Sequence, residues 1–290
     1  MYIEKKKQDN MKKVFITFAV GETYEKLSLV LKDSINSFSE YDLIIYNKED
    51  FDINVDANSG YFVTIYKILS CIKSLEEYDE VVWLDTDCLA TYNIDKVWNN
   101  KVTKYPLLPK HRFYNFDKWP HSKQNYCDPS FLESSKQVVG VTDNSFNDLY
   151  LQSCCMLFNK DCLPFLQESL SYYDNYNGET FPFGDETIIN CMIWKNKYSD
   201  NLGDVFLCSH YFSPHTIEGF IKADNPEDYR RLFDISYRIE GVDEDFLLRH
   251  GVSKAYHNRI GLIENNFENV LFFHGSKLTE IHNGYLTLMK

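Results

Sequence analysis

The stretch Val81-Val82-Trp83-Leu84-Asp85-Thr86-Asp87-Cys88 decides how the rest of this 290-residue chain is interpreted. It begins with an apolar run of β-forming residues, which predicts a buried strand. Asp85 and Asp87 follow where the strand ends, and residues i and i+2 of an extended chain point to the same side. Both carboxylates are therefore expected to face one hard cation. Such a cation would bridge a diphosphate and stabilise charge on a leaving group.

Two further strands are expected upstream of this one. Residues 14–19 and 43–46 are short runs of the same apolar, β-forming kind, and apolar residues recur at helical spacing over 27–35 and 65–75. This β-α-β-α-β alternation predicts a parallel sheet with helices on its faces, so the fold class is α/β. Ligands of such sheets bind beyond the carboxyl ends of the strands, so the residues just after Ala19 and Leu84 are the first site candidates.

The second half of the chain carries weaker patterns. The expected elements are a strand near 105–108 within otherwise loop-like residues 99–148, a strand at 153–158, a helix at 161–173 with Pro164 in its first turn, a helix opened by residues 183–185, strands at 205–208 and 270–273, and a charged helical stretch over 225–250. No internal repeat or linker divides the chain. One domain spanning residues 1–290 is expected, with residues 1–10 as a flexible lead-in.

Composition excludes several classes of protein. Hydrophobic residues at 44% and charged residues at 25% are the balance of a soluble globular protein. A net charge of −13 disfavours a nucleic-acid partner. No apolar run approaches the roughly 18 residues of a membrane span, and residues 1–13 contain no apolar stretch of the kind found in a secretory signal. The eight Cys show no CxxC pair and are interpreted as reduced core thiols, so a cytoplasmic protein is expected.

Two further motifs could carry chemistry. Asp185 and Glu186 open a predicted helix, where capping and the helix dipole are a sufficient structural explanation. The functional alternative makes either acid a general base, a positioning group or a nucleophile. Near the end of the chain, His274 offers an imidazole ligand and Lys277 a cation for phosphate. A lone His at a strand end is more often structural.

These motifs together resemble a known family. Residues 65–78, 81–89 and 93–95 are similar to the donor-site stretch of the glycogenin and bacterial galactosyltransferase family (glycosyltransferase family eight), in which a Lys-bearing helix leads into a hydrophobic strand, Asp-x-Asp and Asn-Ile-Asp. Residues 19–24 resemble its first nucleotide-contacting loop, and residues 184–190 resemble its Gly-Asp-Gln-x-x-x-Asn segment. The order along the chain is the same.

The resemblance implies a GT-A fold, a Rossmann-like mixed, mainly parallel sheet flanked by helices. It also implies transfer of a hexose from a nucleotide diphosphate-sugar, usually UDP-linked, to a glycan or protein hydroxyl, with Mn²⁺ or Mg²⁺ as cofactor. A homodimer is left open. The residues carried over are Asp85, Asp87 and His274 as metal ligands; Ala19, Val20, Tyr24, Lys67, Asp85, Thr86 and Lys277 around the donor; and Asp185 and Glu186 as catalytic groups.

The chain departs from the family pattern at three places. Phe272 stands where the His of the family's His-x-x-Gly-x-x-Lys would be, and His274 directly precedes Gly275. Gln152 and Cys154 alter a segment that usually contains Phe-Asn-x-Gly. Glu186 replaces Gln and could serve as a base, so inversion and retention of anomeric configuration both stay open.

Two other functions fit part of the pattern. A phosphatase of the haloacid dehalogenase type also uses a strand ending in Asp-x-Asp, but there the motif follows the first strand, and Leu89 stands where a small Thr or Val is expected. A non-catalytic nucleotide-sugar or glycan-binding module is the second alternative. Metal-dependent hydrolysis of a donor would distinguish an enzyme from such a module.

Overall fold

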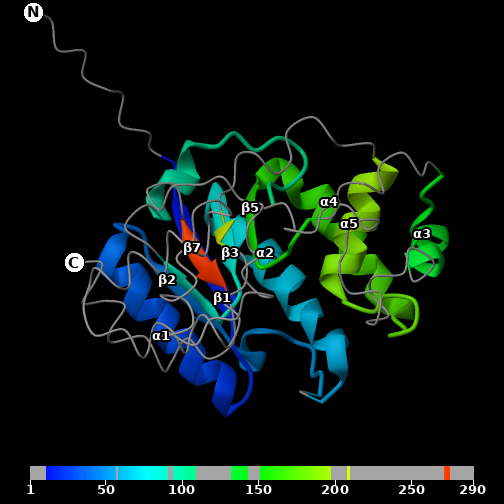
Figure 1. The fold of residues 1–290 in the computed structure, drawn as a ribbon, viewed down its shortest axis with the longest axis horizontal. Coiled ribbons are helices and arrows are strands. Elements are labelled where there is room, and N and C mark those ends of the chain that lie inside the picture. The colour runs from blue at the N-terminus through cyan, green and yellow to red at the C-terminus, as the bar shows by residue number, and fades with distance from the viewer. Residues whose placement is uncertain are drawn as a thin grey trace, which may run out of the picture.

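The computed structural model describes residues 11–56, 58–90, 94–108, 132–142, 151–196, 208–209 and 271–274. Its centre is a four-stranded sheet in the order β2-β1-β3-β5 (Figure 1). The strands are β1 (Lys13–Phe18), β2 (Leu43–Tyr46), β3 (Glu80–Leu84) and β5 (Cys155–Asn159). β1 pairs in parallel with β2 and β3, whereas β5 runs antiparallel to β3. The predicted α/β class, with a mixed and mainly parallel sheet, is confirmed.

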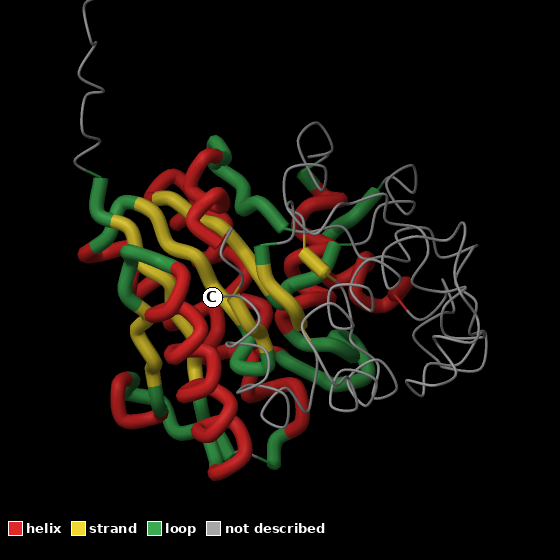
Figure 2. Tube along the Cα trace, turned by 60° about the vertical axis from the view of Figure 1, so that its left-hand side comes forward, coloured by secondary structure: helices red, strands yellow, loops and turns green. Residues whose placement is uncertain are grey.

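Helices cover both faces of this sheet (Figure 2). α1 (Glu22–Phe38) connects β1 to β2, and α2 (Ile65–Glu77) leads from the segment after β2 into β3. Alternate strand residues face opposite layers, as in any strand. Phe15 and Leu84 pack with Leu31 and Ile35 of α1 in one cluster. Because both faces are covered, the strands appear in the sequence as continuous apolar runs.

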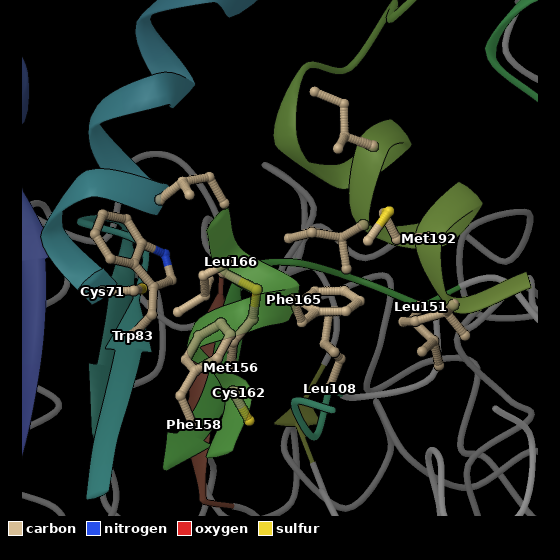
Figure 3. Packing of buried hydrophobic residues seen from close by; sticks show 14 of the residues in the cluster. Cys71, Trp83, Leu108, Leu151, Met156, Phe158, Cys162, Phe165, Leu166 and Met192 are labelled. Carbon is tan, nitrogen blue, oxygen red and sulfur yellow. The ribbon is translucent and has the colours of Figure 1, made fainter. Parts of the chain in front are cut away.

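The second cluster fills the opposite face of the sheet (Figure 3). Trp83 of β3 lies with Met156 and Phe158 of β5 against Cys71 of α2 and Leu166 of α4 (Leu163–Ser171). The same cluster continues to Met192 of α5 (Asp185–Lys195). This larger core holds α2, α4 and α5 together, and α2 and α5 both carry predicted site residues.

A second, three-stranded sheet has the order β4-β7-β6. It consists of β4 (Cys88–Ala90), β6 (Cys208–Ser209) and β7 (Phe272–His274). β4 pairs antiparallel with β7, so that Cys88 is the register partner of His274. The two predicted C-terminal strands are thus found at 208–209 and 272–274, although in a sheet separate from the main one. The expected helical stretch 225–250 and residues 205–207 lie outside the described residues.

Residues 99–196 differ from the prediction in detail. The expected helix 161–173 is α4 with a 3-10 turn on each side, Lys160–Cys162 and Tyr172–Asn175, and Pro164 does lie in its first turn. Within the predicted loops, α3 (Glu133–Val139) forms and packs on α5. Near the expected strand 105–108, Leu107 makes an isolated antiparallel bridge to Leu157. No helix in the described part of the chain is both long and apolar enough to cross a bilayer.

Candidate functional site

The two acids of the Asp-x-Asp motif lie in a turn at the carboxyl end of β3. The Cys88 N–H donates to the Asp85 carbonyl at 3.0 Å, and the Asp85 N–H donates to the Cys154 carbonyl at 2.8 Å. The expectation of an extended chain through Asp87 is therefore wrong, because the strand ends at Leu84 and the chain turns at once. Asp85 and Asp87 are half-buried in this turn, and Thr86 between them is buried.

Lys67 lies at the centre of the site. Its ammonium is 2.9 Å from Asp85 Oδ1 and 2.9 Å from Asp185 Oδ2. It also donates to the carbonyl and the hydroxyl of Ser153, each at 3.2 Å. Lys67 comes from α2, Asp85 from the end of β3 and Asp185 from the first residue of α5. One buried cation thus joins three chain segments, which the sequence had connected only through a family resemblance.

Trp83 completes the surroundings of this cation. The Lys67 ammonium lies 5.3 Å from the centroid of the indole ring, within cation–π range. The indole N–H donates to Asp85 Oδ1 at 2.8 Å. Asp85 therefore receives a charged and a neutral donor on one oxygen, and its carboxylate is fixed relative to the sheet. Trp83, read in the sequence only as part of the strand, is also a site residue.

Burial and charge act in opposite directions on the pKa values of these groups. For Asp185, burial is the largest effect and raises the pKa, while Lys67 lowers it and Asp85 raises it further. For Lys67, burial alone would lower the pKa, but the two carboxylates outweigh it and the pKa is raised. Lys67 is thus held as an ammonium between two acids. Side-chain hydrogen bonds from Lys67 and Ser153 also lower the pKa of Asp185, so the ion pair and these bonds together compensate the buried carboxylate.

Glu186 differs from its neighbour in position. It is half-buried rather than buried, and its Oε2 accepts the Ser153 N–H at 3.2 Å. Its charge is also felt by Tyr61, whose pKa is raised by burial first and then by Glu186. Since Tyr61 is 51% exposed, this phenol and Glu186 mark the solvent side of the cluster.

Asn190, the last residue of the segment 184–190, has a structural role. Its side-chain oxygen accepts the Leu151 N–H at 2.9 Å, and its amide donates to the Leu151 carbonyl at 2.9 Å. The side chain therefore pairs with the backbone of the segment that leads to Ser153, much as a neighbouring strand would. The same amide also donates to the Glu186 carbonyl at 2.8 Å, so Asn190 holds the segment before Ser153 on the first turn of α5.

The predicted donor loop lies at the carboxyl end of β1. Ala19 is buried, and its N–H donates to the Tyr46 carbonyl at 2.9 Å, which extends the β1–β2 pairing. Val20 is half-buried, and Gly21 at φ 82° turns the chain into α1. Tyr24 is 54% exposed and influences the pKa of Tyr61. The ends of β1 and β3 thus face the same side of the sheet, as predicted for parallel neighbours.

The third expected metal ligand is described only through its backbone. β7 pairs with β4 so that His274 is opposite Cys88, directly after Asp87. Within the described residues, no group of three His, Cys, Asp or Glu side chains converges as a metal-binding set. Lys277 lies outside the described residues.

Thr64 and Ser153 are site residues that the sequence did not reveal. The Thr64 hydroxyl accepts the Asp185 N–H at 3.1 Å, and Ser153 contacts Lys67 and Glu186 through three different atoms. Thr64 belongs to no motif, and Ser153 is the variable position of the segment compared with Phe-Asn-x-Gly. The one available indication was a charged residue, Lys67, within the otherwise apolar or small buried face of α2, because such a charge requires partners.

Comparison with known proteins returns glycosyltransferases among solved structures. No family model and no curated protein matches the chain. It is similar to the galactosyltransferase LgtC in complex with donor and acceptor sugar analogs, with 15% identity over 95% of each chain and a TM-score of 0.47. A glycosyltransferase involved in glycosylation of the major capsid of PBCV-1 has 10% identity over 96% of this chain and 99% of that chain, with a TM-score of 0.41. The bifunctional WbbM glycosyltransferase has 10% identity over 91% of this chain and 46% of its own, with a TM-score of 0.48.

Proposed function

We propose that this chain is a metal-dependent glycosyltransferase that moves a hexose from a nucleotide diphosphate-sugar, with UDP as the nucleotide, to a hydroxyl of a glycan or protein. The observation that carries the proposal is the ion-pair cluster of Lys67 with Asp85 and Asp185. It joins the acid after β3 to the acid that opens α5, and it does so at the carboxyl ends of the parallel strands, where ligands of α/β sheets bind. The sequence resemblance assigns these same acids to the donor site.

The donor set fits a hard divalent cation. Asp85 and Asp87 offer carboxylate oxygens, which Mg²⁺ and Mn²⁺ prefer, and the β4–β7 register brings the backbone of His274 next to them. We propose these three residues as the metal ligands. When bound, the cation would neutralise the diphosphate and assist its departure. A chain of net charge −13 has few basic groups that could do this instead.

We assign the remaining roles to side chains of the protein. Lys67 keeps Asp185 fixed and compensates its charge, so we assign Asp185 to positioning the transferred sugar. Glu186 is the more exposed acid and is the candidate to accept the acceptor's proton if the reaction inverts the anomeric centre. If configuration is retained, the departing phosphate takes that proton. Ala19, Val20, Tyr24 and Thr86 are proposed to contact the nucleotide, and Lys277 the diphosphate.

We further propose that residues 1–290 act as one domain in the cytoplasm. Buried cysteines outside any disulfide support a reducing compartment, and they are Cys71, Cys88, Cys155, Cys162 and Cys191. The acidic net charge disfavours nucleic acid as a partner.

Turnover of a nucleotide-sugar panel tests the proposal. The purified protein is incubated with each donor in Mn²⁺, Mg²⁺ or EDTA, and released nucleotide diphosphate is measured. We expect release from one donor, abolished by EDTA and by Asp87→Ala. Asp42→Ala is the matched control, because Asp42 is an exposed acid at the amino end of β2, on the side of the sheet opposite the site. It should retain full turnover.

The other outcomes distinguish the alternatives. Hydrolysis of simple phosphate esters without donor turnover would indicate a phosphatase of the haloacid dehalogenase type. Donor binding without release, measured by calorimetry, would indicate a binding module. Full metal-dependent turnover in a folded Asp87→Ala protein would refute the metal assignment.

A further inference from the structure

Thr64 stands at the N-cap position of α2 but does not cap that helix. Residues Gly60–Thr64 form a 3-10 helix that runs directly into α2, so Thr64 has helical backbone angles (φ −67°, ψ −9°) where a capping Thr would be extended. Its side chain makes no capping hydrogen bond to α2. The hydroxyl donates to the Tyr61 carbonyl at 2.7 Å and accepts the Asp185 N–H at 3.1 Å from a different helix. Its capping capacity is therefore used elsewhere.

The helix capped by Thr64 is α5, which has no side-chain cap of its own. Asp185 is its first residue, so the Asp185 N–H has no partner within the helix. Gly184 occupies the N-cap and has no side chain to offer. A Cβ on Gly184 would meet Thr64 Oγ1 at 2.4 Å and the Tyr61 carbonyl at 2.7 Å. The glycine is thus what allows the Thr64 hydroxyl to reach the helix start.

The same helix, α2, also contacts the side chain of Asp185. Lys67 follows Thr64 by one helical turn, and its ammonium lies 2.9 Å from the Asp185 carboxylate. We propose that Thr64 and Lys67 form a two-point clamp, in which Thr64 fixes the backbone of Asp185 while Lys67 fixes its side chain. Thr64 is then a positioning residue for Asp185. The catalytic part of this inference rests on the proposed function, whereas the clamp itself does not.

The hydrogen-bond capacity of the Thr64 hydroxyl is fully used. A hydroxyl has one donor and two acceptor sites. The donor goes to Tyr61, and the acceptor sites take the Asp185 N–H and the Tyr173 O–H, whose oxygen lies at 2.6 Å. Because the Thr64 proton is already donated to the Tyr61 carbonyl, the Tyr173 phenol is the donor of this bond. Tyr173 thereby fixes the rotamer of Thr64. A capping Thr that faces solvent has no such partner to fix it.

Kinetics of three variants test the role of Thr64. In Thr64→Val we expect kcat to fall on the order of tenfold to a hundredfold with donor KM little changed, because Asp185 is displaced while the nucleotide contacts remain. Thr64→Ser keeps the hydroxyl and should restore kcat. Ser34→Ala is the matched control: Ser34 also donates to a carbonyl of its own helix, at 2.7 Å, and accepts a backbone N–H from another element, at 3.1 Å. It should lose stability but keep kcat.

Amide exchange at Asp185 tests the clamp without turnover. With selective ¹⁵N-aspartate labelling, the Asp185 amide should exchange about tenfold faster in Thr64→Val than in the wild type, and Thr64→Ser should restore protection. Unchanged exchange in a folded Thr64→Val protein would overturn the clamp. Faster exchange with unchanged kcat would overturn the positioning role. If the wild type turns over no donor, the proposed function fails while the exchange result still decides the clamp.

Discussion

Lys67 and Asp185 form an ion pair of 2.9 Å in the interior of the protein, where Lys67 is 7% and Asp185 3% exposed. Two charges are removed from water here, and their attraction must offset a desolvation cost of several kcal/mol per ion. Within the part of the chain that the structure describes, Asp85 places a second carboxylate on the same ammonium. The stability of this region therefore depends on Lys67.

Lys67→Met is expected to destabilise the protein by about 3 to 5 kcal/mol, because it leaves a buried carboxylate without its counter-ion. Urea unfolding followed by circular dichroism measures the change. Lys136→Met is the matched control: Lys136 is also buried and also lies over a Trp ring, but its partner Glu133 is 51% exposed and returns to water when released. We expect Lys136→Met to cost clearly less. Equal losses in the two variants would contradict the argument.

The double variant Lys67→Met/Asp185→Asn separates charge from packing. If the loss in Lys67→Met comes from an unpaired buried charge, neutralising Asp185 should recover a substantial part of it, so the two substitutions should be non-additive. Strict additivity of the unfolding free energies would show that the two side chains act independently.

Three glycines give a graded test of the contact between α5 and the turn before α2. Gly178→Ala should be nearly neutral, since an added Cβ meets nothing within 4 Å and the backbone is ordinary. Gly140→Ala also meets nothing but has φ +85°, so we expect a loss of about 1 kcal/mol. Gly184→Ala combines φ +55° with two contacts under 3.0 Å and should cost more than either. Thermal unfolding ranks the three, and any other order would refute the contact.

The sequence predicted the strands of this protein far better than it predicted how its charged side chains are arranged. β1, β2 and β3 are continuous apolar runs because both faces of the sheet are buried, and this burial leaves a local pattern. The end of β3 was predicted correctly, but the extended chain expected through Asp87 was not found. The Asp85 N–H still continues the β3–β5 pairing by donating to the Cys154 carbonyl, and the chain then turns because the Cys88 N–H donates back to the Asp85 carbonyl.

The clustering of site residues was partly foreseen, but only through resemblance. Nothing local in the sequence connects Lys67 with Asp185, because their contact depends on how α2 and α5 pack. Thr64 was invisible for the same reason: a Thr before a helix is interpreted as the cap of that helix, and here it caps another. Contacts between distant segments leave no periodicity that a single sequence could reveal.

Asn190→Leu is expected to cost about 2 to 4 kcal/mol, because it leaves both the N–H and the carbonyl of Leu151 buried without partners. The apolar side chain fills the space, so packing loss does not explain the effect. Asn196→Leu is the control, since Asn196 is exposed and its side-chain amide donates to the Met192 carbonyl at 2.8 Å. It should change stability by less than about 0.5 kcal/mol. Similar losses in both variants, measured by urea unfolding, would contradict the pairing of Asn190 with Leu151.

Six cysteines should be inert in the native protein. Cys71, Cys88, Cys154, Cys155, Cys162 and Cys191 are all buried. Burial raises the pKa of Cys162 to about 12 and also raises that of Cys71 and Cys191, so the reactive thiolate stays rare. A free thiol gains thiolate almost tenfold between pH 7 and 8, having a pKa of about 8.5. We therefore expect iodoacetamide labelling of these six, mapped by mass spectrometry, to be slow at both pH values and fast only in denaturant. Rapid native labelling that rises with pH at any of the six would show that the core around it opens.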